Sequence, residues 1–495
     1  MEAINIGSRR EVCWDAFLMD KADGIRVQMH RPEYRGDAMT CDAPWEGSTC
    51  GYFTVIPDGE YFRLYYRGSN LNHDEMGNAS FHSGKLCYAL SKDGKTFQKI
   101  PVGLHEFWGT KDNNILSLTT GDNIAIFKDT NPNCPPDERY KGLCGTDKKE
   151  LVYYKSADGV HFEKARVIVS DGAYDSLNVC FWDSASQQYY LFYRGFHGPS
   201  TDGNRSWTKE ETEDPAYKYH LKGLIRDVRV RTSKDFIRWD APQMLQYGAD
   251  AADLELYTNA VQKYYRAEHM FIGFPMRYAD RYEDAHNFSQ LPDWKHRQTI
   301  IKYQEPRSGT AMTDAAIMTS RDGVHFKRWD EAFMTAGIER GTNWYYGDGM
   351  FCYGMAETAS DISGAPNEIS MYMHVDYRVK PVTLRRYGIR LDGFFSWRCD
   401  FKTGKIITKP MIFCGDTLHM NFSTSALGYV HIRILDAEGN PLEGYDSGRH
   451  FGDSVDREVI FDRPVSELAG RPVRLEITMS DADLYSFKFS ENIQL

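Results

Sequence analysis

The chain has 495 residues, of which 41% are hydrophobic and 26% charged, ordinary values for a globular protein. Its formal net charge is −11, from 70 acidic and 59 basic side chains. Because proteins that bind nucleic acids present basic surfaces to phosphate, this balance argues against a nucleic-acid partner. A chain of this length can bury a large core without disulfides or metals.

Sequence features that report on compartment favour the cytoplasm. The first twenty residues lack the basic start and apolar run of a secretory signal. No stretch approaches the 18 apolar residues of a membrane span. The ten cysteines form no C-x-x-C pair, so we expect reduced thiols and no zinc site. We expect no cofactor, no bound metal and no membrane partner, and the sequence is compatible with a homo-oligomer.

A seven-residue pattern, Ser-x-Asp-Gly-x-x-aromatic, recurs along the chain. Its copies are "SKDGKTF" at 91–97, "SADGVHF" at 156–162, the shorter "SKDFIRW" at 233–239, "SRDGVHF" at 320–326 and a degraded "RLDGFFSW" at 390–397. The Asp-Gly pair tolerates the positive φ of a tight turn, and each of the first four copies follows a strand-like run. Each of these copies therefore predicts a β-hairpin.

Two further strand-like runs precede each hairpin. In chain order they cover 51–56 and 61–67, 123–129 and 139–145, 177–183 and 188–194, 258–265 and 269–278, and 347–354 and 368–375. Five units of four strands between residues 44 and 405 predict a five-bladed β-propeller, whose closure removes exposed sheet edges. A β-sandwich would lack the periodic hairpin, and a six-bladed ring would need one more unit.

The segments outside the repeats complete an all-β prediction. Residues 1–43 are expected to pack on the propeller or close it. From residue 406 to 495 polar and apolar residues alternate and the repeat is absent, which predicts a small C-terminal β-sandwich.

Candidate catalytic groups lie where the chain enters each innermost strand, because these points converge on the mouth of the central channel. Glu46, Asp175 and Glu255 are the predicted catalytic carboxylates. Paired carboxylates suit glycoside cleavage, in which one protonates the leaving oxygen and the other attacks or activates water. Asp and Asn before strands are also common turn residues. The residues predicted to bind the substrate are Trp45, Asn114, Asp122, Arg226, Tyr257, Asn259, Arg277, Arg340, Trp344 and Tyr346.

The pattern resembles the furanosidase-type propeller glycoside hydrolases, the group of invertases, levanases, arabinanases and β-xylosidases. The strings "APWEG", "YDSLNVCFWD", "ELYTNAV", "GFPMRY" and "RRYGIRLDGF" are similar to those of an uncharacterised bacterial subgroup. The resemblance implies an acid at the first blade, a supporting Asp at the second and a Glu general acid at a later blade. The sequence departs from that group in lacking "WMNDPNG", "RDP" and the "EC" dipeptide.

The leading hypothesis is an exo-acting glycoside hydrolase for short oligosaccharides, with a furanoside or pentoside as substrate. The repeat also resembles the Asp-box of sialidases, although those enzymes have six blades. A glycoside phosphorylase would need a basic phosphate pocket, for which Arg226 and Arg277 are candidates. A non-catalytic carbohydrate-binding propeller is the alternative of another class, because fold alone does not imply activity.

Overall fold

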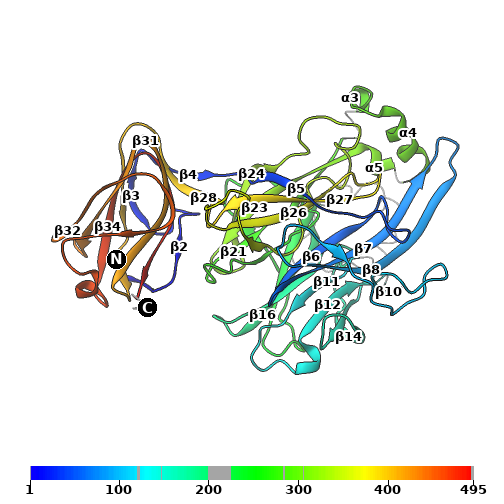
Figure 1. Ribbon diagram of the computed structural model, residues 1–495, viewed down its shortest axis with the longest axis horizontal. Helices are drawn as coiled ribbons and strands as arrows, with labels where there is room; N and C mark the ends of the chain where they lie inside the picture. The colour runs from blue at the N-terminus through cyan, green and yellow to red at the C-terminus, as the bar shows by residue number, and fades with distance from the viewer. Residues whose placement is uncertain are drawn as a thin grey trace.

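The computed structural model describes residues 2–119, 123–146, 148–198, 225–281, 285–304 and 306–491. It contains two β-rich units, a propeller and a smaller unit that holds both ends of the described chain (Figure 1). Within the described residues, no helix is long and apolar enough to cross a membrane.

The first three blades of the propeller are regular antiparallel sheets. The first consists of β6 (Gly51–Asp58), β7 (Tyr61–His73), β8 (Ala79–Ser91), β9 (Gln98–Lys99) and β10 (Ile115–Ser117). The second consists of β11 (Ala125–Lys128), β12 (Tyr140–Gly145), β13 (Leu151–Ser156) and β14 (Glu163–Val169), with the 3₁₀ turn η1 (Pro136–Glu138) before β12. The third consists of β15 (Val179–Asp183), β16 (Gln188–His197), β17 (Ile225–Ser233) and β18 (Gln243–Met244).

The last two blades are less regular. The fourth consists of β19 (Gln246–Tyr247), β20 (Gln262–Lys263), β21 (Phe271–Gly273), β22 (Met276–Asp280), β23 (Ala311–Ser320) and β24 (His325–Met334). The fifth consists of β25 (Ala356–Thr358), β26 (Glu368–Val375), β27 (Thr383–Arg390) and β5 (Glu33–Thr40). Since β5 pairs antiparallel with β27, an early segment of the chain supplies the outer strand of the last blade.

The five blades close into a ring. The inner strands of the first four blades contact one another in the order β6, β11, β15 and β20. The inner strand of the fifth blade, β25, contacts β6 of the first. A parallel bridge between Thr54 and Tyr353 joins the first and fifth blades directly. The all-β fold class and the five-bladed propeller predicted from the repeats are therefore confirmed.

The recurring seven-residue pattern builds the turn between the third and fourth strands of a blade. In the second blade Ser156 Oγ accepts a hydrogen bond from the N–H of Gly159 at 2.9 Å, and Asp158 Oδ1 accepts from the N–H of Val160 at 2.8 Å. Gly159 has φ +75°, which only glycine adopts without strain. This turn lies at the end of the blade opposite the start of the inner strand, so the repeat is structural and distant from the channel mouth.

The third and fifth copies of the pattern differ for physical reasons. Phe236 stands where the others have glycine; it adopts φ 60°, and its ring packs against Tyr153 and Tyr189 at 5.0 Å between ring centroids. The copy at 390–397 closes no blade hairpin. After Asp392 the chain instead leaves the propeller and forms β28 (Phe395–Cys399) in the second unit.

The second unit is an eleven-stranded sheet with a core of its own. Besides β28 it contains β1 (Ile4–Gly7), β2 (Glu11–Val12), β3 (Met19–Asp23), β4 (Ile25–Met29), β29 (Gly404–Thr408), β30 (Met411–Phe413), β31 (Thr417–Asp436), β32 (Pro441–His450), β33 (Asp453–Val459) and β34 (Val473–Ser490). A short 3₁₀ turn, η3 (Val465–Leu468), precedes β34. Residues 4–29 thus belong to this sheet and only β5 to the ring, and the unit begins before residue 406. Strand pairing between distant segments, such as β4 with β28 at Val27 and Trp397, cannot be read from a linear boundary.

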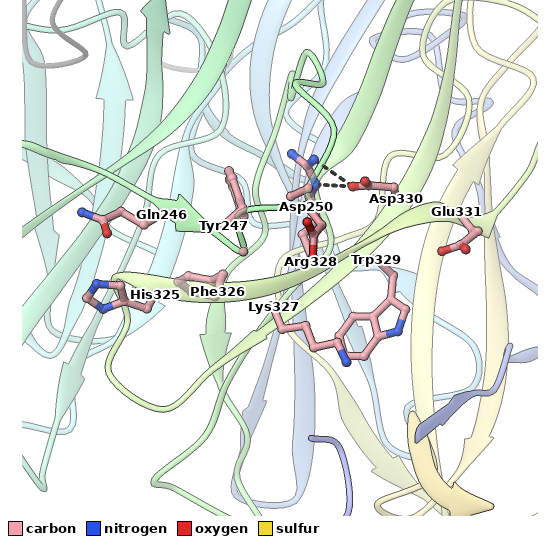
Figure 2. Close-up of a pocket in the computed structure, with 12 residues that line it drawn as sticks. Gln246, Tyr247, Asp250, His325, Phe326, Lys327, Arg328, Trp329, Asp330 and Glu331 are labelled. Carbon is pink, nitrogen blue, oxygen red and sulfur yellow. Dashed lines mark hydrogen bonds and ion pairs between the residues drawn. The ribbon is translucent and has the colours of Figure 1, made fainter. Parts of the chain in front are cut away.

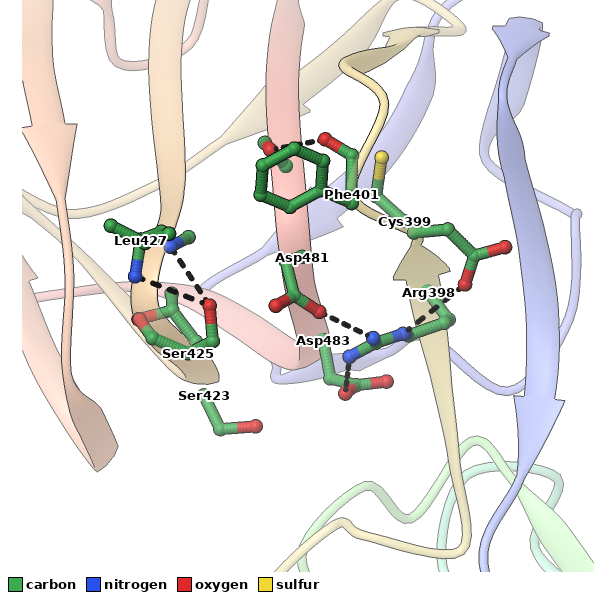
Figure 3. A network of polar contacts seen from close by, with 12 residues as sticks. Arg398, Cys399, Phe401, Ser423, Ser425, Leu427, Asp481 and Asp483 are labelled. Carbon is green, nitrogen blue, oxygen red and sulfur yellow. Dashed lines mark hydrogen bonds and ion pairs between the residues drawn. The ribbon is translucent and has the colours of Figure 1, made fainter.

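Ion pairs hold β28 against β34 in this unit. Arg398 donates to Asp483 Oδ2 at 2.8 Å and to Asp481 Oδ1 at 2.7 Å (Figure 3). Ser396 Oγ donates to Asp483 Oδ1 at 2.6 Å. Because the guanidinium fork engages two carboxylates of one strand, it fixes the register of β28 on β34.

A buried carboxylate joins the two units. Asp392 is fully buried and accepts hydrogen bonds from Tyr264 Oη and Ser486 Oγ, each at 2.6 Å, and from Arg266 Nε at 2.8 Å. Arg10 also donates to it at 3.2 Å. Burial alone would raise the pKa of Asp392, but the charges of Arg10 and Arg266 and the two hydroxyl donors lower it. The junction therefore holds an ionised carboxylate.

Three short helices cross part of the propeller face. They are α3 (Ala285–Phe288), α4 (Trp294–Tyr303) and α5 (Pro306–Thr310), inserted between β22 and β23 of the fourth blade. Tyr303 stacks on His73 at 5.9 Å between ring centroids, and Lys295 Nζ lies 2.6 Å from Glu75 Oε1. The insertion thus reaches from the fourth blade to the β7–β8 hairpin of the first, near which it lies in Figure 1.

Candidate active site

A pocket lies at the end of the ring where the chain enters the innermost strands. We call it the central pocket; four tyrosines from three blades line it, Tyr52, Tyr257, Tyr346 and Tyr377. Tyr257 and Tyr346 meet edge to face, with ring centroids 5.5 Å apart. The four phenol rings give this pocket an aromatic wall with several hydroxyl groups, which suits the ring faces and hydroxyls of a sugar.

Arginine side chains lie over these rings and over Tyr278, which stacks on Tyr257. Measured from the guanidinium carbon to the ring centroid, the contacts are Arg67 on Tyr52 at 4.9 Å, Arg194 on Tyr257 at 5.3 Å, Arg226 on Tyr278 at 4.4 Å, Arg307 on Tyr346 at 5.2 Å and Arg378 on Tyr377 at 5.6 Å. Cation–π attraction favours this stacking and holds the guanidinium planes in place. Arg307 comes from α5 and Arg378 from the loop after β26.

Two of the predicted catalytic carboxylates pair with arginines that lie over Tyr257 of the central pocket. Asp175, in the loop before β15, forms an ion pair with Arg194, and its side chain is 72% exposed. Glu255, in the segment before β20, forms an ion pair with Arg226 and is 25% exposed. Although this side chain keeps most of its surface exposed, nearby protein atoms displace part of the surrounding water, which would raise the pKa of Asp175. The charge and hydrogen bond of Arg194 outweigh this effect and lower the pKa. Asp175 is therefore an ionised carboxylate open to solvent at the pocket edge.

Tyr257 differs from the other phenols of the central pocket. Burial raises the pKa of Tyr52 and of Tyr346 above the usual value of a phenol. At Tyr257 the same effect is outweighed by the charges of Arg307 and Arg194, which lower its pKa. The two guanidinium groups therefore make Tyr257 a stronger acid than its neighbours and would stabilise its phenolate.

The structure places Glu46 outside this pocket, contrary to the sequence-based prediction. Its side chain has no exposed surface; it accepts hydrogen bonds from Tyr66 Oη and from the N–H of Ala43, the latter at 3.0 Å, and lies 2.7 Å from Lys99 Nζ. The carboxylate closes the turn that begins at Ala43, a local role that the sequence does not reveal. Both carboxylate oxygens of Glu46 are engaged inside the blade, so Glu46 does not line the central pocket.

Trp45 and Asn114 belong to the same buried network. Trp45 Nε1 donates to Asn114 Oδ1 at 2.7 Å, and Asn114 Nδ2 donates to Tyr66 Oη at 2.8 Å. Both side chains were predicted to bind the substrate, but both are buried and offer little surface to a ligand.

The remaining predicted binding residues are distributed over other parts of the propeller. Asn259 is buried and donates to the carbonyl of Leu177 at 3.1 Å, and Arg277 Nε donates to Asp314 Oδ1 on β23 at 2.6 Å. Arg340 lines a separate cavity of about 250 Å³, and Trp344 Nε1 donates to the carbonyl of Gly337. Asp122 lies outside the described residues. The structure brings together Asp175, Glu255, Arg226, Tyr257 and Tyr346.

Sequence reasoning missed Tyr52, Tyr377 and four of the five arginines of this region. One signal was present: the second strands of the first and third blades contain "LYYR" and "LFYR", which place Arg67 and Arg194 at equivalent positions. Aligning the blades would have found this pair. Arg307 and Arg378 have no such signal, because an insertion and a loop bring them to the pocket.

Another hollow, of about 640 Å³, lies on the outer edge of the fourth blade between β19 and β24 (Figure 2). Its central charges pair with each other: Arg328 Nη2 lies 2.8 Å from Asp330 Oδ1, and the guanidinium covers the ring of Tyr247. This hollow shares no lining residue with the central pocket and contains none of its four tyrosines. The hollow is therefore a weaker candidate for catalysis.

No family model matches the sequence, and no curated protein is similar to it. Among solved structures, an N-acetylgalactosamine deacetylase from F. plautii is 11% identical, with a TM-score of 0.43 over 74% of this chain and 96% of its own. The catalytic domain of a GH62 alpha-L-arabinofuranosidase from Coprinopsis cinerea is 8% identical, with a TM-score of 0.38 over 73% and 99%. A glycoside hydrolase family 43 arabinoxylan arabinofuranohydrolase from Bacillus subtilis is 10% identical, with a TM-score of 0.30 over 90% and 96%. At these values the comparisons do not assign the chain to a family.

Proposed function

We propose that the protein is a glycoside hydrolase whose active site is the central pocket. The observation that carries the proposal is Asp175: an ionised, solvent-facing carboxylate beside a wall of tyrosines at the point where the blades converge. Aromatic faces to bind a sugar ring, and a carboxylate to attack or activate water, are the two requirements of glycoside cleavage.

The chemical roles follow from the charge state of each group. Asp175 takes a proton from the attacking water as the new bond to the anomeric carbon forms. Tyr257 gives its proton to the leaving oxygen as the glycosidic bond breaks, and Arg194 and Arg307 stabilise the phenolate that results. The proton returns from Asp175 to Tyr257 through solvent, so the cycle balances.

Glu255 has a positioning role in this proposal. Its ion pair with Arg226 holds that guanidinium over Tyr278 and, at 5.5 Å, over Tyr257. A carboxylate engaged by arginine stays ionised, so it does not suit the proton donor that the sequence analysis expected from a carboxylate pair.

The cavity of the central pocket is small, about 20 Å³, so we propose that only the end of a short substrate enters it. The helices reach from the fourth blade to the first, and α5 brings Arg307 over Tyr346 of the pocket. This supports exo action on short oligosaccharides. We propose a furanoside or a pentoside as the first substrate to test.

The test is turnover of para-nitrophenyl glycosides by wild type and variants. Asp175→Asn and Tyr257→Phe should each lower kcat/KM by about 10²- to 10⁴-fold, the range for a general base or acid. The matched control is Asp171→Asn, which removes an arginine-paired carboxylate four residues earlier in the same loop. Undiminished turnover by Asp175→Asn would refute the assignment, and sugar binding without turnover in the wild type would favour a carbohydrate-binding propeller.

A further inference from the structure

A second cavity, of about 250 Å³, is lined by residues of the fourth and fifth blades and is separate from the central pocket. We call it the side cavity; Met334 of β24 and Met373 and Val375 of β26 belong to its lining. His374, between the two β26 residues, lines the central pocket instead. Since side chains alternate along a strand, the two cavities lie on opposite faces of β26.

Three arginines from separate parts of the chain line the side cavity. Arg31 precedes β5, Arg340 lies in the loop between β24 and β25, and Arg385 is on β27. The backbone N–H of Arg340 donates to Asn343 Oδ1 at 2.7 Å, but its guanidinium group has no hydrogen-bond or ion-pair partner among the described residues. The donors of this guanidinium group are therefore open to a ligand.

The other two arginines are only partly engaged. Arg31 donates from Nε to the carbonyl of Phe333 at 3.1 Å and from Nη2 to that of Ala332 at 2.8 Å, which leaves Nη1 without a hydrogen bond to the described residues. Arg385 Nε lies 3.3 Å from Asp37 Oδ1, but it is buried and makes no hydrogen bond within the described parts of the chain. A buried donor without an acceptor is costly, so an acceptor beside Arg385 would stabilise it.

Asp348, an acid that lines the side cavity, does not compete for these donors when it is neutral. It is 4% exposed and accepts a hydrogen bond from the N–H of Tyr345 at 3.0 Å. Burial raises its pKa to about 7; Asp376 acts in the same direction, and the charge of Arg340 acts against it. Arg297 also faces this carboxyl group. At pH 6 the group is therefore mostly protonated and forms no ion pair with the arginines.

Apolar side chains complete the wall of the side cavity. They are Met334, Ala336, Met373 and Val375. Guanidinium groups bind carboxylate oxygens, and apolar side chains favour an aliphatic body. Pockets for drug-sized ligands begin at about 300 Å³, so the occupant of this cavity is smaller than those.

We infer that the side cavity is a second ligand site, which binds a small organic acid through its carboxylate and a short aliphatic chain. The side cavity shares no lining residue with the central pocket, so this inference goes beyond the proposed glycoside cleavage and does not depend on it. Inorganic phosphate suits the site less well, because it would leave the apolar wall uncovered.

Ligand-observed NMR titrations of the wild-type protein at pH 6 and low salt test the inference, because they detect weak binding of small molecules. The probes are butyrate, the neutral butyramide, the shorter acetate and inorganic phosphate. Butyrate should bind at least about tenfold more tightly than butyramide, and the difference should shrink as salt screens the charges. Butyrate should also bind more tightly than acetate, because its longer chain covers more of the apolar wall.

Variants place the binding in the side cavity. Arg340→Gln and Arg385→Gln should each weaken butyrate binding by about tenfold, the effect of losing one charged hydrogen bond. Arg238→Gln changes an arginine that is 90% exposed at a turn of the third blade; it is the control and should have no effect. Arg340 is exposed, so its variant should fold even if the loss of Arg385 is destabilising, and melting temperatures check this.

The carboxyl group of Asp348 adds a dependence on pH. Butyrate is ionised at pH 6 and at pH 8, whereas Asp348 gains its negative charge between these values and then repels the ligand. Wild-type affinity for butyrate should therefore fall as pH rises from 6 to 8, while Asp348→Asn should bind equally at both. A wild type that binds equally at both would overturn the placement of the carboxylate in this cavity.

Three other results would each overturn the inference. They are equal affinity for butyrate and butyramide, unchanged butyrate affinity in both arginine variants, and tighter binding of phosphate than of butyrate. None of them bears on turnover by the central pocket, which the Asp175→Asn variant tests separately.

Discussion

Removal of the charge on Asp392 should destabilise the protein more than any exposed ion pair does. Its carboxylate, fully buried, accepts from two arginines, Arg10 and Arg266, and from the hydroxyls of Tyr264 and Ser486. In Asp392→Asn both guanidinium groups would face a neutral amide inside the protein, and one amide N–H₂ would point at former donors. Breaking a buried charge pair costs about 3–5 kcal/mol, so we expect the free energy of unfolding to fall by that amount.

Urea denaturation followed by tryptophan fluorescence measures this loss, because Trp14 Nε1 donates to the carbonyl of Asp392 and reports on the junction. The matched control is Asp400→Asn, which breaks the exposed pair with Arg26 and should leave the free energy of unfolding nearly unchanged. The folded pKa of Asp392 is lowered, so its stabilisation is present above the unfolded pKa and is lost as pH falls through the folded value. Wild type and Asp392→Asn should thus converge in acid. A loss below about 1 kcal/mol at pH 7 would refute the role of this carboxylate.

Three further substitutions test other parts of the argument. Glu46→Gln should lower the melting temperature, because it removes the buried ion pair with Lys99, and should retain turnover. Loss of turnover in a folded variant would show that Glu46 takes part in catalysis. Gly159→Ala should cost about 1–3 kcal/mol, because φ is +75° and the new Cβ would meet Tyr65 Oη at 2.7 Å, whereas Gly248→Ala faces open space and should be neutral. Burial raises the pKa of Asp348 to about 7, so its contribution to stability is full below pH 3.8 and lost as pH rises through 7. Asp348→Asn should therefore be more stable than wild type at pH 8, by about 4 kcal/mol, in thermal melts compared across pH; equal melts at pH 8 would contradict the buried acid.

Local signals made the propeller predictable. A tight turn is a property of four or five adjacent residues, so Ser156, Asp158 and Gly159 report their hairpin without any distant contact. Five sheets of this kind in sequence leave few arrangements other than a ring.

The site was only partly predictable, because the start of an inner strand fixes where a residue lies but not where its side chain points. Asp175 and Glu46 both precede an inner strand, yet one faces solvent beside Arg194 and the other is enclosed by Tyr66 and Lys99. Such differences depend on donors that come from other strands. A carboxylate's role therefore could not be read from its neighbours in the chain.

The sequence by itself determined the all-β class, the blade turns and the number of blades, since each depends on residues close together in the chain. Only the tertiary structure decided that residues 33–40 close the ring, that residues 4–29 join the second unit, and that arginines from four separate segments converge on Tyr257 and Tyr346. These features depend on contacts between separate strands, loops and helices, whose pairing is set by packing and charge in the folded molecule and leaves no local pattern.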